Sequence, residues 1–316
     1  MKTEYRHIPV MADESIESLN LKPSSIFVDC TLGGAGHSML AAKAIAAEGT
    51  LIGIDEDPMA IEAATARIEG EFPGMDFRPM QGDFADLDAI LCRAQVPGID
   101  AILFDLGLSS PQIDFPERGF SYKENAPLDM RRNSGKHTKT AAEVIATLNE
   151  TDLARIFREY GEEKWAARIA SFIVRRREEQ PIETTFDLVD VIRAAIPASA
   201  RREGGHPAKR VFQALRIEVN GELEGLRKGL DAAIRWLRPG GRIVVISYHS
   251  LEDRIVKETF ASMAKGCTCP PDLPVCVCGH EPSVKIVTRK PVVPTQEERE
   301  TNPRANSAKL RVAEKL

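Results

Sequence analysis

The sequence of 316 residues predicts an α/β fold in which a parallel sheet is interrupted by an inserted all-helical domain. Three apolar runs predict buried strands, and each ends in an acidic residue, at 26–29, 51–55 and 99–105. Helical patterns and short loops separate these runs, an alternation that is typical of parallel α/β sheets. From about Leu108 to Asn220 the pattern is helical and shows no convincing strand, so we expect the insertion there.

The elements of the first half follow in a regular order. A helix opens at Asp57-Pro58, because an acid suited to be the N-cap precedes a proline suited to the first helical position. The other elements expected in this half are a helix, a strand, a helix and a buried strand, at 38–47, 77–80, 87–94 and 99–105.

The insertion carries apolar patterns of its own. Residues at helical spacing predict three amphipathic helices, around 153–160, 166–173 and 188–192. We expect N-caps of two of these helices at Thr151 and Thr185.

Strands resume after the insertion, at 243–247, near 284–288 and at 310–312. The predicted domains are therefore a sheet domain in two parts, 1–107 and 217–316, and a helical insertion at 108–216 that recognises the substrate.

The composition narrows the class of protein. With 43% hydrophobic and 28% charged residues, the chain is not expected to be disordered. No apolar run approaches the ~20 residues of a membrane span, and the N-terminus lacks a signal-peptide core, so we expect a cytoplasmic protein without a membrane partner. The net charge of −5 argues against a general nucleic-acid binder, but not against an RNA enzyme whose positive charge is gathered on one face.

A glycine-rich turn carries the strongest functional signal. Gly33, Gly34 and Gly36 lie between the strand that ends at Asp29 and an Ala-rich helix, a turn that permits close backbone approach. Asp55, at the tip of the second strand, is suited to accept hydrogen bonds from two ribose hydroxyls. Together these residues predict a site for an adenosine-containing cofactor, whereas the glycines alone are compatible with a simple tight turn.

The spacing of the glycines separates the possible cofactors. A dinucleotide fingerprint beginning at Gly34 needs a small third residue where this chain has Met39, and no P-loop motif is present. S-adenosylmethionine has no pyrophosphate, and its methionyl tail needs room and an acid such as Asp29 to face the ammonium. A methyl-donor site is therefore favoured over a nicotinamide-dependent oxidoreductase, for which the chain also lacks a hydride-site group.

Asp105 follows the fourth strand, where such sheets usually present catalytic groups. Its carboxylate, or a neighbouring carbonyl, is placed to accept from a substrate amine in an in-line methyl transfer that depends on positioning and desolvation. A capping turn before the insertion is the structural alternative. The chain lacks the Asn/Asp-Pro-Pro-aromatic turn of many amino-methyltransferases.

The segment after the fifth strand contains Ser250 and, three residues on, Asp253, a pair that resembles a capping box. We therefore expect Ser250 to be structural. His249 beside it is a general base, a substrate contact or a satisfied polar residue, and the sequence leaves these open.

The six cysteines include two C-x-C pairs, Cys267 with Cys269 and Cys276 with Cys278. Without a signal peptide, disulfides are not expected. The two pairs could clamp a structural zinc ion, and thiols in a loop are the alternative. We assign no metal ligand from the sequence.

Basic residues cluster in and just after the insertion, and any one pair is readily explained as a solvated face. Several together, beside a methyl-donor cleft in an acidic protein, predict a local phosphate-binding surface. His206 and Phe212 could add base stacking, with a core position as the alternative for Phe212. The clusters are Arg131-Arg132, Arg175-Arg176-Arg177, Arg201-Arg202, Lys209-Arg210 and Arg216.

Long motifs along nearly the whole chain resemble the bacterial family of small-subunit ribosomal RNA cytidine-N4 methyltransferases, the methyltransferase H or MraW family. The motifs are residues 7–10, 29–37, 105–112, 118–121, 128–131, 160–163, 212–216, 249–254 and 302–304.

This resemblance implies a Rossmann-like class I methyltransferase sheet with a helical insertion, S-adenosylmethionine as cofactor, and a cytidine in the decoding region of 16S ribosomal RNA, within the small subunit, as substrate. The role of the paired C-x-C segment is not carried over, and the oligomeric state stays open, with a homodimer among the candidates. A non-catalytic RNA-binding or scaffold protein that retains the fold is the second rival reading. The implied donor contacts are Gly34, Ala35, Gly36, His37, Asp55, Phe84, Asp105 and Gln112, of which Asp105 is also the catalytic candidate.

Overall fold

The computed structural model describes residues 9–46, 48–107, 115–133, 138–202, 205–267, 269, 275, 278–279 and 281–316. The chain divides into two compact units. Met1–Gly107 and Leu223–Leu316 form the first, which we call the sheet unit, and Leu108–Glu222 forms the second, the helical unit.

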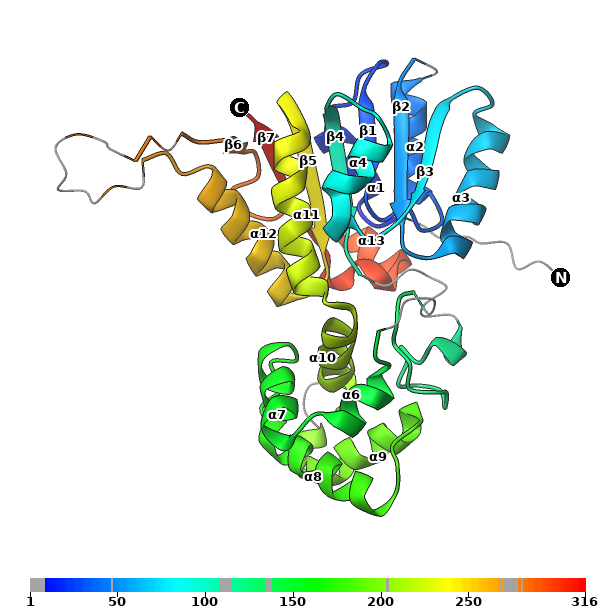
Figure 1. Cartoon of the computed structure of the whole chain (residues 1–316), viewed down its shortest axis with the longest axis vertical. Coiled ribbons are helices and arrows are strands. Elements are labelled where there is room, and N and C mark those ends of the chain that lie inside the picture. The colour runs from blue at the N-terminus through cyan, green and yellow to red at the C-terminus, as the bar shows by residue number, and fades with distance from the viewer. Residues whose placement is uncertain are drawn as a thin grey trace. The chain divides into compact units, whose positions relative to one another are not determined.

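The described strands of the sheet unit form one seven-stranded sheet in the order β3-β2-β1-β4-β5-β7-β6 (Figure 1). The strands from β3 to β5 pair in parallel, whereas β7 is antiparallel to both β5 and β6. The order reverses between β1 and β4, and ligands of such sheets bind at the carboxyl ends of the strands beside this reversal. The strands are β1 (Ile26–Asp29), β2 (Thr50–Asp55), β3 (Asp76–Gln81), β4 (Ile99–Asp105), β5 (Leu237–Ser247), β6 (Val284–Ile286) and β7 (Lys309–Lys315).

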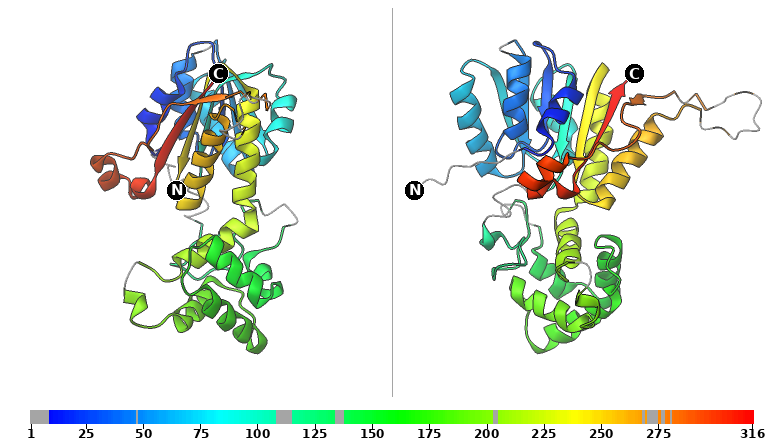
Figure 2. Two further views of the ribbon diagram at one scale, coloured as in Figure 1. Left: turned by 90° about the vertical axis from the view of Figure 1, so that its left-hand side faces the viewer. Right: turned by 180° about the vertical axis from the view of Figure 1, so that it is seen from behind.

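Helices cover both faces of the sheet. From β1 through β2 to β3 the chain moves toward one edge of the sheet, and from β3 to β4 and β5 it moves toward the other edge. Because connections between parallel strands are right-handed, α2 and α3 lie on one face of the sheet and α4 and α11 on the other. Figure 1 shows α4 and α11 in front of the sheet, and the rear view of Figure 2 shows α1 and α2 in front of it. The helices are α1 (Ala12–Leu19), α2 (Gly36–Ile45), α3 (Pro58–Glu71), α4 (Leu87–Arg93), α11 (Glu222–Trp236), α12 (Ser250–Met263) and α13 (Gln296–Thr301), with 3-10 turns η1 (Phe84–Asp86) and η4 (Pro303–Ser307).

The central strands are almost wholly apolar, and their side chains are buried on both faces. Phe27 of β1, Ile52 of β2 and Phe104 of β4 have no exposed surface. This burial explains why continuous apolar runs, rather than alternating ones, predicted these strands. The parallel α/β fold predicted from the sequence is confirmed.

The N-terminus of α3 agrees with the prediction from the sequence, whereas that of α2 does not. Asp57 caps α3 as predicted, since its side chain accepts a hydrogen bond from Met59 N at 3.0 Å and Pro58 follows. The first helix predicted at 38–47 begins earlier, at Gly36, because Ala35 takes a left-handed conformation (φ 60°) and serves as the N-cap of α2. Residue 47 lies outside the described residues.

The helical unit has its own apolar core. Phe157, Ile169, Leu188 and Leu215 lie in it with no exposed surface. Within the described part of this unit the only strand-like pairing is a single bridge between Pro127 and Thr184. Its helices are α6 (Ala141–Thr147), α7 (Glu150–Glu159), α8 (Ala166–Glu179), α9 (Thr185–Ala195) and α10 (Lys209–Asn220), with 3-10 turns η2 (Pro116–Arg118) and η3 (Ala200–Arg202).

Two N-caps and the C-terminal boundary of the helical unit lie a few residues from their predicted positions. The N-cap expected at Thr151 is Asn149, and the one expected at Thr185 is Thr184, which forms a capping box with Asp187. The unit ends at Glu222 rather than at position 216, because α10 continues to Asn220. None of the described helices is both long enough and apolar enough to cross a membrane.

Candidate active site

The glycine-rich turn joins β1 to α2 at the carboxyl edge of the sheet. Gly33 has a positive φ of 46°, and the left-handed Ala35 turns the chain into the helix. A side chain on Gly36 would lie 3.1 Å from Pro9 Cβ, so glycine lets the N-terminal segment pack closely against the turn. From α3, Arg67 donates to the Gly34 carbonyl at 2.8 Å and holds the turn in place.

The first turn of α2 has the properties of an anion site. Its N-cap Ala35 offers no side-chain acceptor, so the first amide groups of the helix are left for another partner. Their partial positive charge attracts carboxylates. The turn can therefore hold the carboxylate of an amino-acid tail.

Asp55 lies at the end of β2, beside the turn. Its Oδ2 accepts from Gly33 N and its Oδ1 from Asp57 N, both at 2.9 Å. These two bonds fix the carboxylate plane, and each oxygen keeps a lone pair for a further donor. Burial raises the pKa of Asp55 to about 6, against the lowering by those amide bonds. The geometry suits a pair of neighbouring hydroxyls, which would favour the ionised form.

Asp29 is more enclosed than expected, with 2% of its surface exposed. One oxygen accepts from Ser38 Oγ at 2.7 Å and the other from Thr31 N at 3.1 Å. Burial raises the pKa of Asp29, whereas His37 and these hydrogen bonds lower it. Asp29 thus ties β1 to α2 and supplies negative charge from beneath the turn, so the sequence assigned it a more direct contact than its position favours.

His37 and Asp105 face each other across the edge between α2 and β4. His37 Nε2 lies 3.0 Å from the Val10 carbonyl, which can only accept, so Nε2 carries the proton and Nδ1 faces Asp105. Nδ1 is 3.6 Å from Asp105 Oδ2, too far for a hydrogen bond, and the two side chains attract each other when the imidazole is protonated. Burial raises the pKa of Asp105, and His37 and a tyrosine hydroxyl oppose that rise.

Tyr248 supplies that hydroxyl, and sequence reasoning missed it. It follows β5, and its OH donates to Asp105 Oδ1 at 2.6 Å. The ring lies against Gly107, where an added Cβ would be 3.1 Å from Tyr248 Cδ2. Burial and Asp105 raise the pKa of Tyr248 well above its usual value, so the hydroxyl stays a donor. The signal available was the parallel pairing of β4 with β5, which brings the residues after both strands to one edge.

Phe84 lies close to this edge, but its ring points into the core. Gly82 N bonds the Asp55 carbonyl at 2.9 Å, which fixes the β3 end beside β2. The Phe84 ring meets Phe104 edge to face at 5.5 Å and is 7% exposed. Since Phe84 opens η1, its amide group has no partner within that turn and can face a ligand. A backbone contact therefore fits Phe84 better than ring stacking.

These residues fit the parts of S-adenosylmethionine at the level of chemistry. Asp55 suits a ribose, the α2 amide groups suit a carboxylate, and the acids Asp29 and Asp105 suit a cationic ammonium and sulfonium. No part of the arrangement provides the third small residue that a dinucleotide pyrophosphate needs.

Comparison with known proteins shows the family of this chain. The MraW methylase family model matches residues 4–316. The chain belongs to the MraW methylase family. Two relatives named ribosomal RNA small subunit methyltransferase H, from Heliobacterium mobile and Geobacter sulfurreducens, are 52% and 54% identical to it. The first alignment covers 99% of this chain and 100% of the relative, and the second covers 99% of both.

A solved structure described as a putative rRNA-methylase from Clostridium thermocellum aligns with 98% of this chain and 100% of that one. Its identity is 11% and its TM-score is 0.45. The family match and the order of the strands in the sheet confirm the Rossmann-like methyltransferase fold predicted from the sequence.

In this MraW-family protein, the segment after β5 differs from the prediction. His249, not Ser250, is the N-cap of α12, and its capping-box partner is Glu252. Asp253 instead accepts from Arg311 Nε at 2.6 Å and Lys309 Nζ at 3.1 Å, and so joins α12 to β7. The prediction was wrong because His249 has the extended backbone of an N-cap and its Nδ1 accepts from Glu252 N at 3.4 Å.

Several predicted basic residues are bonded within the helical unit. They hold loops and helix ends, so they cannot all serve a phosphate-binding surface. Arg131 pairs with Asp129 through two bonds of 2.7 and 2.9 Å, Arg132 and Arg216 both pair with Glu222 at 3.1 and 2.9 Å, and Arg177 donates to the carbonyls of Ile145 and Leu148.

Other basic residues of the helical unit remain exposed: Arg175, Arg201, Lys209 and Arg210. Phe212 is 4% exposed and packs edge-on against Tyr122, so the core position is confirmed and the stacking role was wrong. Tyr122 itself stacks on His206 at 4.5 Å. Gln112, His7 and Cys276 lie outside the described residues.

Proposed function

We propose that this protein transfers a methyl group from S-adenosylmethionine to the exocyclic N4 amine of a cytidine in the decoding region of 16S ribosomal RNA. One observation carries the proposal: Asp55, the first turn of α2 and Asp105 lie at the carboxyl ends of β2, β1 and β4, beside the strand-order reversal. The names of the relatives, ribosomal RNA small subunit methyltransferase H, support the choice of RNA.

Each donor-binding role follows from the groups that the site offers. Asp55 accepts the two ribose hydroxyls, and the amide groups of Gly36 and His37 hold the tail carboxylate. The amide group of Phe84 and the Asp83 carboxylate bind the adenine edge. When bound, the cofactor supplies an electrophilic methyl group on a positively charged sulfur.

Asp105 acts on the incoming amine. The lone pair of an exocyclic aromatic amine is delocalised into the ring, so the amine is a weak nucleophile. A carboxylate that accepts an N–H from this amine draws electron density back toward nitrogen and aligns it for in-line attack. Tyr248 occupies Asp105 Oδ1, so Oδ2, which lies 3.6 Å from His37 Nδ1, is the oxygen that accepts this contact. The proton of the methylated amine then leaves to solvent.

The helical unit recognises the RNA. Its exposed Arg175, Arg201, Lys209 and Arg210 provide phosphate contacts, although the whole chain has a net charge of −5. A substrate bound as part of a folded ribosomal particle adds recognition by shape to recognition by charge. We place this reaction in the cytoplasm.

Incubation with tritiated S-adenosylmethionine and small ribosomal subunits from cells that lack this protein tests the proposal. We expect about one methyl group per subunit, recovered as N4-methylcytidine after digestion to nucleosides. The Asp105→Asn variant should bind S-adenosylhomocysteine and lose most of the methyl transfer at saturating donor. Label in another nucleoside would contradict the proposed substrate atom.

A thermal-shift comparison separates the rival functions. S-adenosylhomocysteine should raise the melting temperature, because a ligand that binds only the folded state stabilises it, whereas NAD should not. Stabilisation by NAD alone would favour an oxidoreductase. Stabilisation by S-adenosylhomocysteine with no methyl transfer to any RNA would favour a non-catalytic binding protein.

A further inference from the structure

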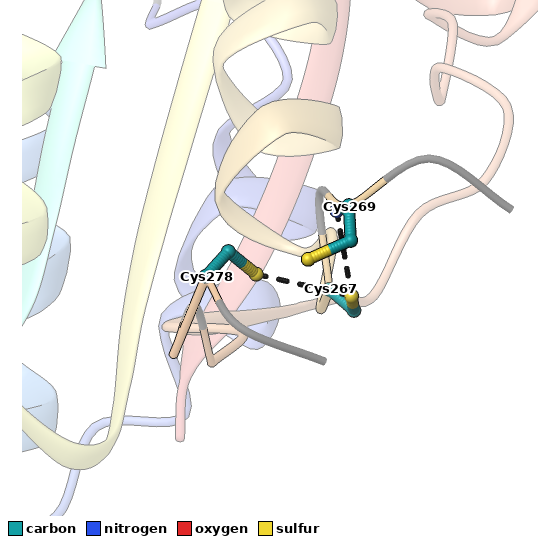
Figure 3. A group of neighbouring side chains, drawn as sticks. All are labelled: Cys267, Cys269 and Cys278. Atoms are coloured by element: carbon teal, nitrogen blue, oxygen red, sulfur yellow. Dashed lines mark hydrogen bonds between the residues drawn. The ribbon is translucent and has the colours of Figure 1, made fainter. Parts of the chain in front are cut away.

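Three cysteines gather in the segment between α12 and β6, which contains none of the donor-site residues (Figure 3). Cys267 and Cys269 come from one side of this segment and Cys278 from the other, and their sulfur atoms all lie within 4.8 Å of one another. We propose that Cys267, Cys269 and Cys278 bind a structural zinc ion, which closes the segment into a fixed loop.

The spacing of one sulfur pair matches tetrahedral zinc. Zinc–sulfur bonds of about 2.3 Å at tetrahedral angles place neighbouring sulfurs about 3.8 Å apart. Cys267 Sγ and Cys278 Sγ are 3.8 Å apart. A disulfide would require about 2.05 Å, so this pair is spaced for a shared ion rather than for an S–S bond.

The backbone already supports a thiolate at Cys267. The amide of Cys269 points its N–H at Cys267 Sγ, with 3.4 Å between nitrogen and sulfur (Figure 3). Such N–H···S bonds stabilise the negative charge that a metal-bound sulfur carries, as other second-layer contacts do in metal sites. A short C-x-C spacing permits this bond, since the amide two residues on folds back over the first sulfur.

The described residues at the base of this segment are joined by hydrogen bonds. Its stem is closed by Ser283, whose N and Oγ donate to the Met263 carbonyl at 2.8 and 3.3 Å. Beyond the stem, the described residues form no helix or strand, and Val275 is 70% exposed rather than packed in a core. A metal ion that clips a long loop offsets the entropy of ordering it.

Zinc is the ion that this donor set selects. Thiolates are soft ligands that favour zinc over magnesium or calcium, and zinc prefers four tetrahedral ligands. The proposal depends on the three described sulfurs. Cys276 lies outside the described residues. The cobalt spectrum described below counts the thiolates and so shows whether the fourth ligand is a thiolate.

The test uses the full chain, expressed with added zinc and purified without chelators. Elemental analysis should find about one zinc per chain in the natural protein and in the Cys92→Ser variant. Cys92 is also exposed but lies on α4, so it is the matched control. Cys267→Ser and Cys278→Ser should each retain less than about a tenth of the zinc, while S-adenosylhomocysteine binding stays unchanged.

Cobalt loading gives a second measurement that does not depend on the variants. Co²⁺ in this site should show a sulfur-to-cobalt charge-transfer band and the strong visible bands of tetrahedral cobalt, and the band intensity counts the thiolates. A natural protein without zinc and without the charge-transfer band would overturn the proposal. So would a Cys267–Cys278 disulfide in the freshly purified protein, or full zinc content in Cys267→Ser. None of these results bears on methyl transfer.

Discussion

Asp55 is the residue that we propose to bind the ribose. Both of its oxygens are held by amide groups, of Gly33 and of Asp57, so the carboxylate cannot turn away from a ligand. Asp55→Ala should weaken S-adenosylhomocysteine binding by at least about tenfold, because two hydrogen bonds to a charged group are lost. Isothermal calorimetry measures the change, and an unchanged affinity would refute the ribose contact.

Donor binding should also depend on pH through the same carboxylate. In the ligand-free protein the pKa of Asp55 is about 6, so the group is mostly protonated below that pH and mostly ionised above it. Only the ionised form accepts both hydroxyls, so affinity should rise between about pH 5 and pH 7 and then level off. In Asp55→Asn that rise should be absent. A rise of the same size in this variant would assign the pH dependence to another group.

Tyr248 should affect the pKa of Asp105 rather than the binding of the methyl donor. Its hydroxyl bond favours the ionised form of Asp105, so Tyr248→Phe should raise the pKa of Asp105 further. The acidic limb of the methylation rate at saturating donor should then move to higher pH by about one unit. S-adenosylhomocysteine affinity at pH 8 should stay within about twofold. If the acidic limb kept its position, Tyr248 would be only a packing residue.

At this scale, sequence reasoning succeeded where a residue's role is local. Asp57-Pro58 specifies its own cap, and Asp55 ends an apolar strand, so both positions followed from neighbouring residues. Tyr248 was missed because its partner Asp105 is remote in sequence and meets it only through the pairing of β4 with β5. Ser250 was expected in the capping box because histidine is an unusual N-cap, whereas His249 fills that position.

The capping box at the N-terminus of α9 should contribute measurably to the free energy of unfolding. Thr184 and Asp187 form both bonds of a capping box at the start of α9. Thr184→Ala should therefore lower the free energy of unfolding by about 1 kcal/mol. Thr151→Ala is the matched control, because Thr151 is exposed inside α7 and caps nothing. Urea denaturation followed by circular dichroism measures both, and equal losses would contradict the assignment.

Among the elements, the buried strands were the most predictable. β4 spans 99–105 as expected, since a continuous apolar run ended by an acid leaves little freedom in its limits. β7 extends beyond the expected 310–312 to Lys309–Lys315, because pairing with β5 recruits polar residues such as Lys309 and Glu314. Such residues carry no strand signal of their own.

For the whole molecule, the helical unit and the donor site should be separable by mutation. Reversing exposed charges with Arg175→Glu or Lys209→Glu should weaken binding to small-subunit RNA and lower the salt dependence by about one unit of slope per lost phosphate contact. Neither change should alter S-adenosylhomocysteine affinity. Lys43→Glu, an exposed change on α2, is the control. If all three variants bound RNA alike, the helical unit would not be the RNA-binding part.

A long stretch without strands between 108 and 220 predicts a helical region from local sequence patterns alone. The basic clusters, by contrast, were treated alike, although Arg132 and Arg216 converge on Glu222 inside the unit. Only the tertiary fold distinguishes a partly buried, ion-paired arginine from an exposed one.

A crystal structure of the chain soaked with S-adenosylhomocysteine tests the donor site most directly. We expect the two ribose hydroxyls on the Asp55 oxygens, the tail carboxylate at the amide groups that begin α2, and the sulfur directed toward Asp105. A sheet edge filled by side chains, or a ribose bound away from Asp55, would contradict the account.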